Sequence, residues 1–181
     1  MPYVCKSLTE LTLPHDFDCN EPALNRFLLQ NALENESRGV CTTHLFCEVV
    51  DSESVILGYF SLSTTPLDIN HLDQRTIKRL PAYAKANLTA TLLARLALDK
   101  KYHGKKLGIL LLIESLKAVE ASWKLVNSVG LLVHAKHDNA ASFYSAHGFS
   151  SLSKNHLELF MPKKEVLAIV AQTKKRSDVS V

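Results

Sequence analysis

The 181-residue sequence lacks any apolar run long enough to cross a membrane. A spanning helix needs about 20 consecutive apolar residues, whereas the apolar residues here fall in short runs. The first residues also lack the basic segment, the apolar segment and the small-residue cleavage site of a secretory signal. We therefore expect a cytoplasmic protein with no membrane partner, and its length and composition suit one domain.

Several cofactor and metal motifs are absent as well. Neither GxxxxGK followed by Ser or Thr nor GxGxxG occurs, which disfavours nucleotide hydrolysis and dinucleotide redox chemistry. His134 and His137 have HxxH spacing, but no carboxylate or cysteine motif completes a set of ligands, so no metal is expected. The cysteines follow no CxxC spacing, and we expect reduced thiols at Cys5, Cys19, Cys41 and Cys47. The net charge of +3 permits RNA binding without indicating it.

The hydrophobic pattern predicts a mixed α/β domain. Strands that alternate with helices in the C-terminal half favour at least one parallel pair across a crossover helix. The expected helices are residues 22–39, 72–80 and 107–123, then 138–147, and the expected strands are 40–50, 57–65, 88–98, 129–135 and 156–161. After residue 162 we expect a basic tail or helix over residues 163–181.

A basic, glycine-containing turn lies between the expected buried strand and the apolar helix that begins near Leu107. Free backbone N–H groups and the positive end of the helix dipole make such a helix start suited to an anion such as pyrophosphate. Four lysines are expected to add positive potential there, namely Lys100, Lys101, Lys105 and Lys106. Taken alone, the turn fits a solvated connection equally well.

Three segments of the chain resemble a known family. Residues 93–99 (LARLALD) and 102–108 (YHGKKLG) resemble the acetyl-CoA strand and pyrophosphate loop of GCN5-related N-acetyltransferases (GNATs), and residues 140–149 (AASFYSAHGF) resemble their later helix. The resemblance implies a GNAT fold over residues 1–162. This fold has a mostly antiparallel twisted sheet, with a parallel pair at the acetyl-CoA site, and is flanked by helices.

The N-terminal half narrows the resemblance. Residues 17–19 (FDC), 24–28 (LNRFL) and 58–62 (GYFSL) are similar to the branch that contains toxins of toxin–antitoxin modules. That branch implies acetylation of the α-amino group of aminoacyl-tRNA, which blocks translation. It also implies a homodimer and a ribbon-helix-helix antitoxin as partner. Acetylation of a small-molecule or protein amine, and a non-catalytic binding module of the same fold, stay as alternatives.

The resemblance also implies a cofactor site. Backbone groups of Leu96, Ala97 and Leu98 would pair with the pantetheine arm of acetyl-CoA and polarise the thioester. The pyrophosphate would bind at His103, Gly104, Lys105, Lys106, Leu107 and Gly108.

The turn departs from the family pattern at two positions. His103 stands where Gln or Arg is usual, and Lys106 replaces the first of the later glycines. A lysine held at positive φ would cost about 1 kcal/mol, which its charge near pyrophosphate could offset. His137 stands where Asn or Asp is common, and we assign it no cofactor role.

Tyr144 is the expected catalytic residue, because the resemblance makes it the proton donor to the departing CoA thiolate. Reference pKa values of about 10 for tyrosine and 8.5 for a thiol make full transfer uphill by about 2 kcal/mol unless the site lowers the tyrosine pKa. Packing of Tyr144 in the core is the alternative. No general base is identifiable, but an α-amino group with a reference pKa of about 8 needs less help than a lysine.

Substrate contacts are expected from two places. Arg95 is the only charge in an otherwise apolar strand, so it either pairs with a buried carboxylate or reaches the substrate. Asn35 and Arg38 lie on a helical face that either contacts the acceptor or is merely solvated.

Overall fold

The structure, a computed structural model, describes residues 3–8, 13, 16–51, 53–72, 74–79, 82, 85, 87–152 and 155–178. Its contacts divide the chain into two compact units. Unit 1 comprises Met1–Ser63 and Ala94–Ser115, and unit 2 comprises Thr64–Leu93 and Leu116–Val181. No helix among the described residues combines the length and apolarity needed to span a membrane.

The strands form a seven-stranded sheet in the order β1-β2-β3-β4-β5-β7-β6. It is mostly antiparallel, and its parallel pair joins β4 to β5. The expected α/β class and the parallel pair are therefore confirmed. The strands are β1 (Tyr3–Ser7), β2 (Thr42–Val50), β3 (Glu53–Pro66), β4 (Thr89–Leu98), β5 (Gly130–His134), β6 (Ser150–Ser151) and β7 (Glu158–Pro162).

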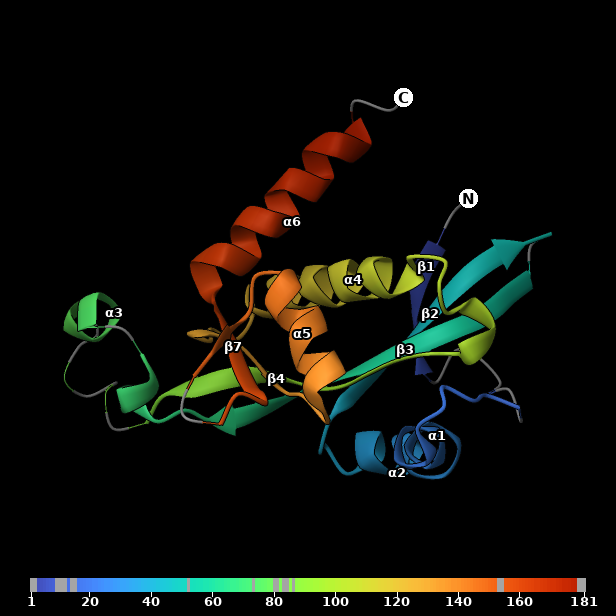
Figure 1. Cartoon of the computed structure of the whole chain (residues 1–181), viewed down its shortest axis with the longest axis horizontal. Coiled ribbons are helices and arrows are strands. Elements are labelled where there is room, and N and C mark those ends of the chain that lie inside the picture. The colour runs from blue at the N-terminus through green and yellow to red at the C-terminus, as the bar shows by residue number, and fades with distance from the viewer. Residues whose placement is uncertain are drawn as a thin grey trace. The chain divides into compact units, whose positions relative to one another are not determined.

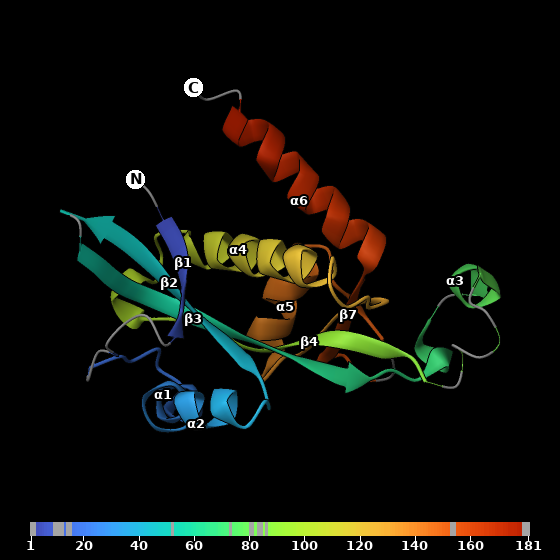
Figure 2. The same ribbon diagram turned by 180° about the vertical axis from the view of Figure 1, so that it is seen from behind.

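Unit 1 contains β1, β2, most of β3 and the end of β4. Figures 1 and 2 show its helices on the two faces of these strands, with α1 and α2 on one face and the start of α4 on the other. The first face is covered by α1 (Pro22–Arg26), a π-helical turn (Phe27–Asn31) and α2 (Ala32–Ser37). This confirms the expected first helix, although neither the π turn nor β1 was predicted.

The core of unit 1 forms where this helical segment meets the strands. Its largest fully buried side chain is Tyr59, whose hydroxyl donates a 2.8 Å hydrogen bond to the carbonyl of Leu24. A buried hydroxyl without a partner is unfavourable. This bond supplies the partner and also fixes the helix against β3. The cluster consists of Leu8, Phe17, Cys19, Phe27, Leu28, Ala32, Cys41, Leu45, Cys47, Tyr59 and Ala97.

Unit 2 contains the start of β4 together with β5, β6 and β7. Its helices are α3 (Gln74–Arg79), α5 (Asp138–Ala146) and α6 (Lys163–Asp178), and α4 (Leu107–Ser122) enters it from unit 1. The expected helices 107–123 and 138–147 are confirmed, and the tail begins as a helix. The short helix expected over residues 72–80 is confirmed as α3, but Leu80 and the proline after it, Pro81, which was expected to end the helix, lie outside the described residues.

Two features hold unit 2 together. The indole N–H of Trp123 donates a 2.7 Å hydrogen bond to Oγ1 of Thr91, which ties the end of α4 to β4. A buried apolar cluster contains Leu67, Leu72, Leu88, Ala90, Leu132 and Phe160. The division of the chain into a domain over 1–162 and a tail over 163–181 stays a prediction.

Gly58 in β3 permits a close approach of the backbone of β4. A Cβ placed at this position would lie 2.5 Å from the carbonyl oxygen of Ala97 and 3.1 Å from Cα of Leu98. These are backbone atoms, which cannot move aside as the end of a flexible side chain can. Glycine at this position therefore sets the path of β4 through the residues expected to hold pantetheine.

We expect Gly58→Ala to lower the free energy of unfolding by about 2 to 3 kcal/mol, because the added methyl group forces the two strands apart. Urea denaturation would measure this loss. Gly39→Ala is the matched control, since Gly39 has φ +69° but a Cβ added there would meet nothing within 4 Å, so only backbone strain of about 1 kcal/mol applies. Equal losses in the two variants would contradict the steric account.

Candidate functional site

The turn between β4 and α4 has the backbone geometry of a tight anion loop. A 3₁₀ turn at Lys100–Tyr102 follows β4, and φ is then +76° at Gly104 and +61° at Lys106. Glycine adopts this conformation without strain, whereas lysine does not. The sequence-based expectation of positive φ at Lys106 is therefore confirmed, and the chain carries a strained residue directly before α4.

The carboxylate of Asp99 holds the turn in place. Its side chain is 4% exposed. Its Oδ1 accepts a 2.9 Å hydrogen bond from the N–H of Lys101, and its Oδ2 accepts one of 3.2 Å from the N–H of Asp18. The N–H of Asp99 itself donates to the carbonyl of Leu57. The carboxylate of Asp99 thus joins the turn to the loop before α1, and the N–H of the same residue joins it to β3.

Asp18 reinforces this junction with its own carboxylate. Its Oδ1 accepts hydrogen bonds from the N–H of Asn20 and the amide of Asn25, and its Oδ2 pairs with the ammonium of Lys100. The bond from Lys100 above all, aided by those from Asn20 and Asn25, holds the pKa of Asp18 well below its usual range. Asp18 is therefore a permanent anion at the start of the turn.

Two of the four lysines expected to supply positive potential are neutralised by these acidic neighbours. Lys100 pairs with Asp18 at 2.5 Å, and Lys101 pairs with Asp16 at 2.6 Å. These hydrogen bonds raise the pKa of both lysines. The positive field at the turn thus comes mainly from the backbone N–H groups and from Lys105 and Lys106.

His103 bends back over the turn. Its Nε2 lies 2.9 Å from the carbonyl oxygen of Leu98, and because a carbonyl only accepts, that nitrogen must carry the proton. Lys105 holds its ammonium 5.2 Å from the ring centroid of Tyr102, within the range of a cation–π contact. Any pantetheine contact at Leu98 must use its N–H or share the carbonyl with His103.

Arg95 has a different partner from the buried carboxylate considered above. Its guanidinium carbon lies 3.5 Å from the ring centroid of Phe27 in the π turn, and no carboxylate in the described part of the chain pairs with it. Asn35 donates to the carbonyl of Asn31, and Arg38 pairs with Glu34 on the exposed surface of α2. All three candidate substrate residues belong to unit 1.

An open cavity of about 250 Å³ adjoins the turn in unit 1. Ligand pockets usually measure about 300 to 1,000 Å³, so it is small for a coenzyme. Two carboxylates and one lysine also line it, which disfavours pyrophosphate, and none of residues 104–108 contributes to it. The lining consists of Asp16, Ser54, Val55, Ile56, Asp99, Lys101 and Tyr102.

Tyr144 belongs to α5 in unit 2, where its ring is buried. The ring packs edge-on against Phe143 and Phe149, with centroid distances of 5.4 and 5.3 Å. No described residue forms a hydrogen bond with the hydroxyl of Tyr144. In the described part of the chain, every side-chain oxygen or nitrogen that is sealed from solvent has a hydrogen-bond partner. Burial raises the pKa of Tyr144 above its ordinary value, the reverse of the shift that full proton transfer would require.

His137 caps α5. Its Nδ1 accepts a 3.2 Å hydrogen bond from the N–H of Ala140, the function that Asn or Asp performs at a helix start. Nδ1 of His134 lies 3.9 Å from Oε1 of Glu158. Among the described residues no group of three His, Cys, Asp or Glu side chains is placed to hold a metal ion.

All four cysteines are free thiols, as expected. Burial raises the pKa of Cys47 to about 11 and also raises that of Cys19. A protonated thiol is a poor nucleophile. These two cysteines are therefore unsuited to covalent catalysis.

Comparisons with known proteins find relatives over most of the chain, although no family model matches it. A tRNA-acetylating toxin of Mycobacterium tuberculosis (strain ATCC 25618 / H37Rv) is 28% identical over 158 residues, covering 85% of this chain and 88% of the relative. The solved structure of AtaT complexed with acetyl-methionyl-tRNAfMet has a TM-score of 0.81 at 26% identity, covering 93% of this chain and 99% of that one.

Two further structures show AtaT in other complexes. AtaTR bound with AcCoA has a TM-score of 0.76 at 26% identity, covering 92% of this chain and 97% of that one. A tyrosine-to-phenylalanine mutant of AtaT bound to the C-terminus of the antitoxin AtaR has a TM-score of 0.75 at 26% identity, covering 95% and 99%.

In sequence and in fold, the chain is similar to tRNA-acetylating toxins of the GNAT type. The GNAT fold expected from the sequence is thereby confirmed. The strained backbone at Lys106 therefore lies in the turn that is expected to bind pyrophosphate.

The strain at Lys106 can be measured by comparing two substitutions. We expect Lys106→Gly to have a free energy of unfolding about 1 kcal/mol higher than Lys106→Ala, because both remove the charge but only glycine relieves the positive φ. At Lys117, inside α4, the same pair should show the opposite order by about 1 kcal/mol. Denaturant titration of the four variants measures both differences, and an alanine variant at 106 as stable as the glycine variant would refute the strain.

Proposed function

We propose that the chain transfers an acetyl group from acetyl-CoA to the α-amino group of an aminoacyl-tRNA and thereby acts as a translation-blocking toxin. The observation that carries the proposal is the strained turn between β4 and α4, found in a chain whose relatives are tRNA-acetylating toxins. The AtaTR structure with AcCoA supports acetyl-CoA as the co-substrate.

The turn and the end of β4 supply the cofactor contacts. Residues 103–108 hold the pyrophosphate mainly through backbone N–H groups and the N-terminus of the 16-residue helix α4. Backbone groups of Leu96, Ala97 and Leu98 hold the pantetheine arm and polarise the thioester carbonyl. Losing one such oxyanion donor costs about 3 to 4 kcal/mol in other enzymes.

The reaction is a direct attack. The lone pair of the amine forms the new C–N bond, the C–S bond of the thioester breaks, and CoA leaves as a thiolate while the amine loses a proton. No acyl-enzyme is formed, which agrees with the raised thiol pKa of Cys19 and Cys47. An α-amino group with a reference pKa of about 8 is partly neutral near pH 7 and can attack without a strong base.

Tyr144 stabilises the leaving thiolate in this scheme. Because burial raises its pKa, it acts by donating a hydrogen bond rather than by giving up its proton completely. Its hydroxyl has no partner among the described residues, so that donor is available to a ligand.

The acceptor can be identified directly. Purified chain incubated with labelled acetyl-CoA and a mixture of charged tRNAs should transfer label to the aminoacyl end of at least one of them. Deacylated tRNA and free lysine are the controls. Label on lysine or on a protein amine, with none on any aminoacyl-tRNA, would favour the small-molecule or protein acetyltransferase instead, and failure of acetyl-CoA to bind at millimolar concentration would leave the non-catalytic module.

For the chemistry, we expect Tyr144→Phe to lower kcat about 100-fold while the calorimetric affinity for acetyl-CoA stays within twofold. Tyr59→Phe is the matched control, because it loses the bond to Leu24 and about 1 kcal/mol of stability but should keep kcat. Unchanged turnover in Tyr144→Phe would remove Tyr144 from the reaction.

The remaining assignments extend the proposal. We infer a cytoplasmic homodimer whose partner is a ribbon-helix-helix antitoxin, and the AtaT complex with AtaR supports an antitoxin of some kind. Arg95, Asn35 and Arg38 are proposed to contact the acceptor. The stacking of Arg95 on Phe27 gives this residue a fixed position from which to do so.

A further inference from the structure

The positive charge of the chain is concentrated in unit 2. Unit 2 has 13 Lys and Arg residues against 7 Asp and Glu, a formal net charge of +6, whereas unit 1 has 8 against 11, a net charge of −3. The whole-chain value of +3 conceals this division. An extended anion would therefore be attracted to unit 2.

Within unit 2, lysines gather where the start of α6 meets the turn that follows α4. Lys163 donates a 2.7 Å hydrogen bond to Oδ1 of Asn127, and its ammonium lies 5.4 Å from the ring centroid of Trp123. Lys174, farther along α6, pairs with Glu120 at 2.6 Å. These contacts tie α6 to the end of α4.

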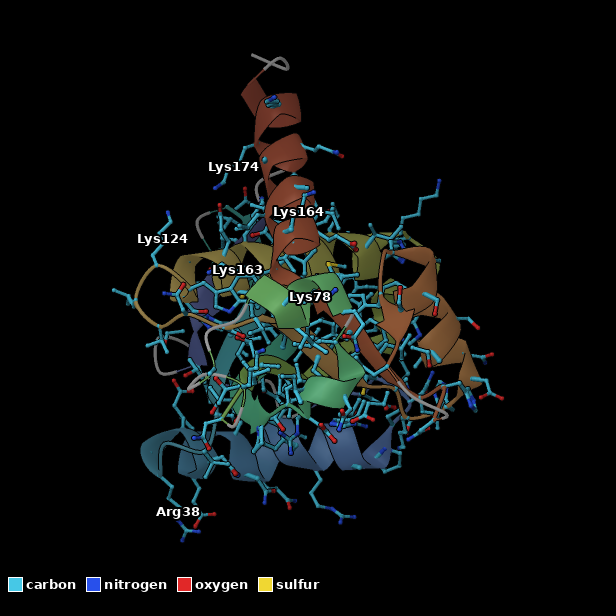
Figure 3. The ribbon with its side chains drawn as sticks, turned by 90° about the vertical axis from the view of Figure 1, so that its left-hand side faces the viewer. Arg38, Lys78, Lys124, Lys163, Lys164 and Lys174 are labelled. Carbon is cyan, nitrogen blue, oxygen red and sulfur yellow. The ribbon has the colours of Figure 1, made fainter. Side chains whose placement is uncertain are left out.

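We call the four lysines of these two segments the lysine face. In Figure 3 their side chains extend from α6 and from the turn after α4. Lys164 and Lys174 are separated by ten helical residues, about 15 Å along the axis, which is long enough to meet several backbone phosphates. The lysine face consists of Lys124, Lys163, Lys164 and Lys174.

Two members of the lysine face have uncompensated charge. Lys124 and Lys164 are exposed, and no carboxylate in the described part of the chain pairs with either of them. The acidic side chains nearby are Glu120, which Lys174 neutralises, and the exposed Glu165 of α6. The ammonium groups of Lys164 and Lys124, one on α6 and one on the turn after α4, are point charges suited to phosphate oxygens.

We propose that the lysine face binds the phosphate backbone of the helical stem of the tRNA substrate. This inference rests on the proposed function and names a surface for its substrate. Lysine contacts of this kind position a nucleic acid without reading its sequence, and a double-stranded RNA stem is held mainly through its backbone. The lysine face thus provides affinity, and the choice of tRNA depends on other residues.

A protein partner fits this surface less well. Leu125 and Val126, in the same turn, are 90% and 69% exposed, but two side chains offer far less than the roughly 800 Å² that each partner buries in a stable complex. The lysines, moreover, would have to be matched by acidic groups of that partner. The positive charge of the lysine face therefore favours RNA over a protein as its partner.

The test compares Lys124→Ala/Lys164→Ala with Lys85→Ala/Lys136→Ala, which removes the same charge from exposed positions elsewhere in unit 2. Binding of uncharged tRNA and of a hairpin copy of its acceptor stem would be measured at several salt concentrations. We expect the first variant to bind about tenfold more weakly and to lower the slope of log K against log salt by about 2. The control should keep both values.

The outcomes separate this inference from the proposed function. Equal binding by the two double variants overturns the lysine face while leaving tRNA acetylation intact. Binding of acetyl-CoA without binding of any tRNA by the unaltered chain overturns both. A change in oligomeric state of the first variant in sedimentation, with tRNA binding unchanged, would make the surface a protein interface and also refute the proposal.

Discussion

The buried carboxylate of Asp99 is the group on which the turn between β4 and α4 depends. It accepts hydrogen bonds from the N–H groups of Lys101 and Asp18, while its own N–H is bonded to Leu57. Two segments distant in sequence, the loop before α1 and β3, are thereby fixed to the residue that directly follows β4. A buried carboxylate without these donors would be costly, so the shape of the turn depends on the loop before α1.

This arrangement determines how the turn can bind an anion. Asp16 and Asp18, which come from the loop before α1, pair with Lys101 and Lys100 of the turn. The turn therefore gains rigidity at the expense of side-chain charge. In the proposed function, backbone N–H groups held in a fixed concave geometry, together with Lys105 and Lys106, attract the pyrophosphate, and the strained backbone at Lys106 belongs to that geometry. A basic local sequence is thus a poor guide to local positive charge, because the acidic partners come from residues more than 80 positions away.

Local patterns predicted the regular elements well. The helices that begin at Leu107 and Asp138 and the hairpin of β2 and β3 follow from periodicity within single segments. Positive φ at Lys106 was predictable because the family pattern has glycine there.

Features that rest on contacts between segments were missed. The π turn at Phe27–Asn31 places Phe27 under Arg95, and nothing in either segment alone signals that stacking. The strand β1, with every residue only partly buried, shows no clear alternation and pairs with β2 from about 40 residues away. The bond from His103 to Leu98 likewise depends on how the turn folds back.

The environment of Tyr144 limits how this residue can take part in the proposed reaction. Packing between Phe143 and Phe149 fixes the ring, and the same burial raises the hydroxyl pKa. A weaker acid loses its proton less readily, but its hydroxyl is a dependable neutral donor over the whole physiological range of pH. The apolar ring environment that seemed to argue for a purely structural tyrosine is therefore compatible with catalysis. It requires only that the thiolate be stabilised by a hydrogen bond and take its proton later, from solvent.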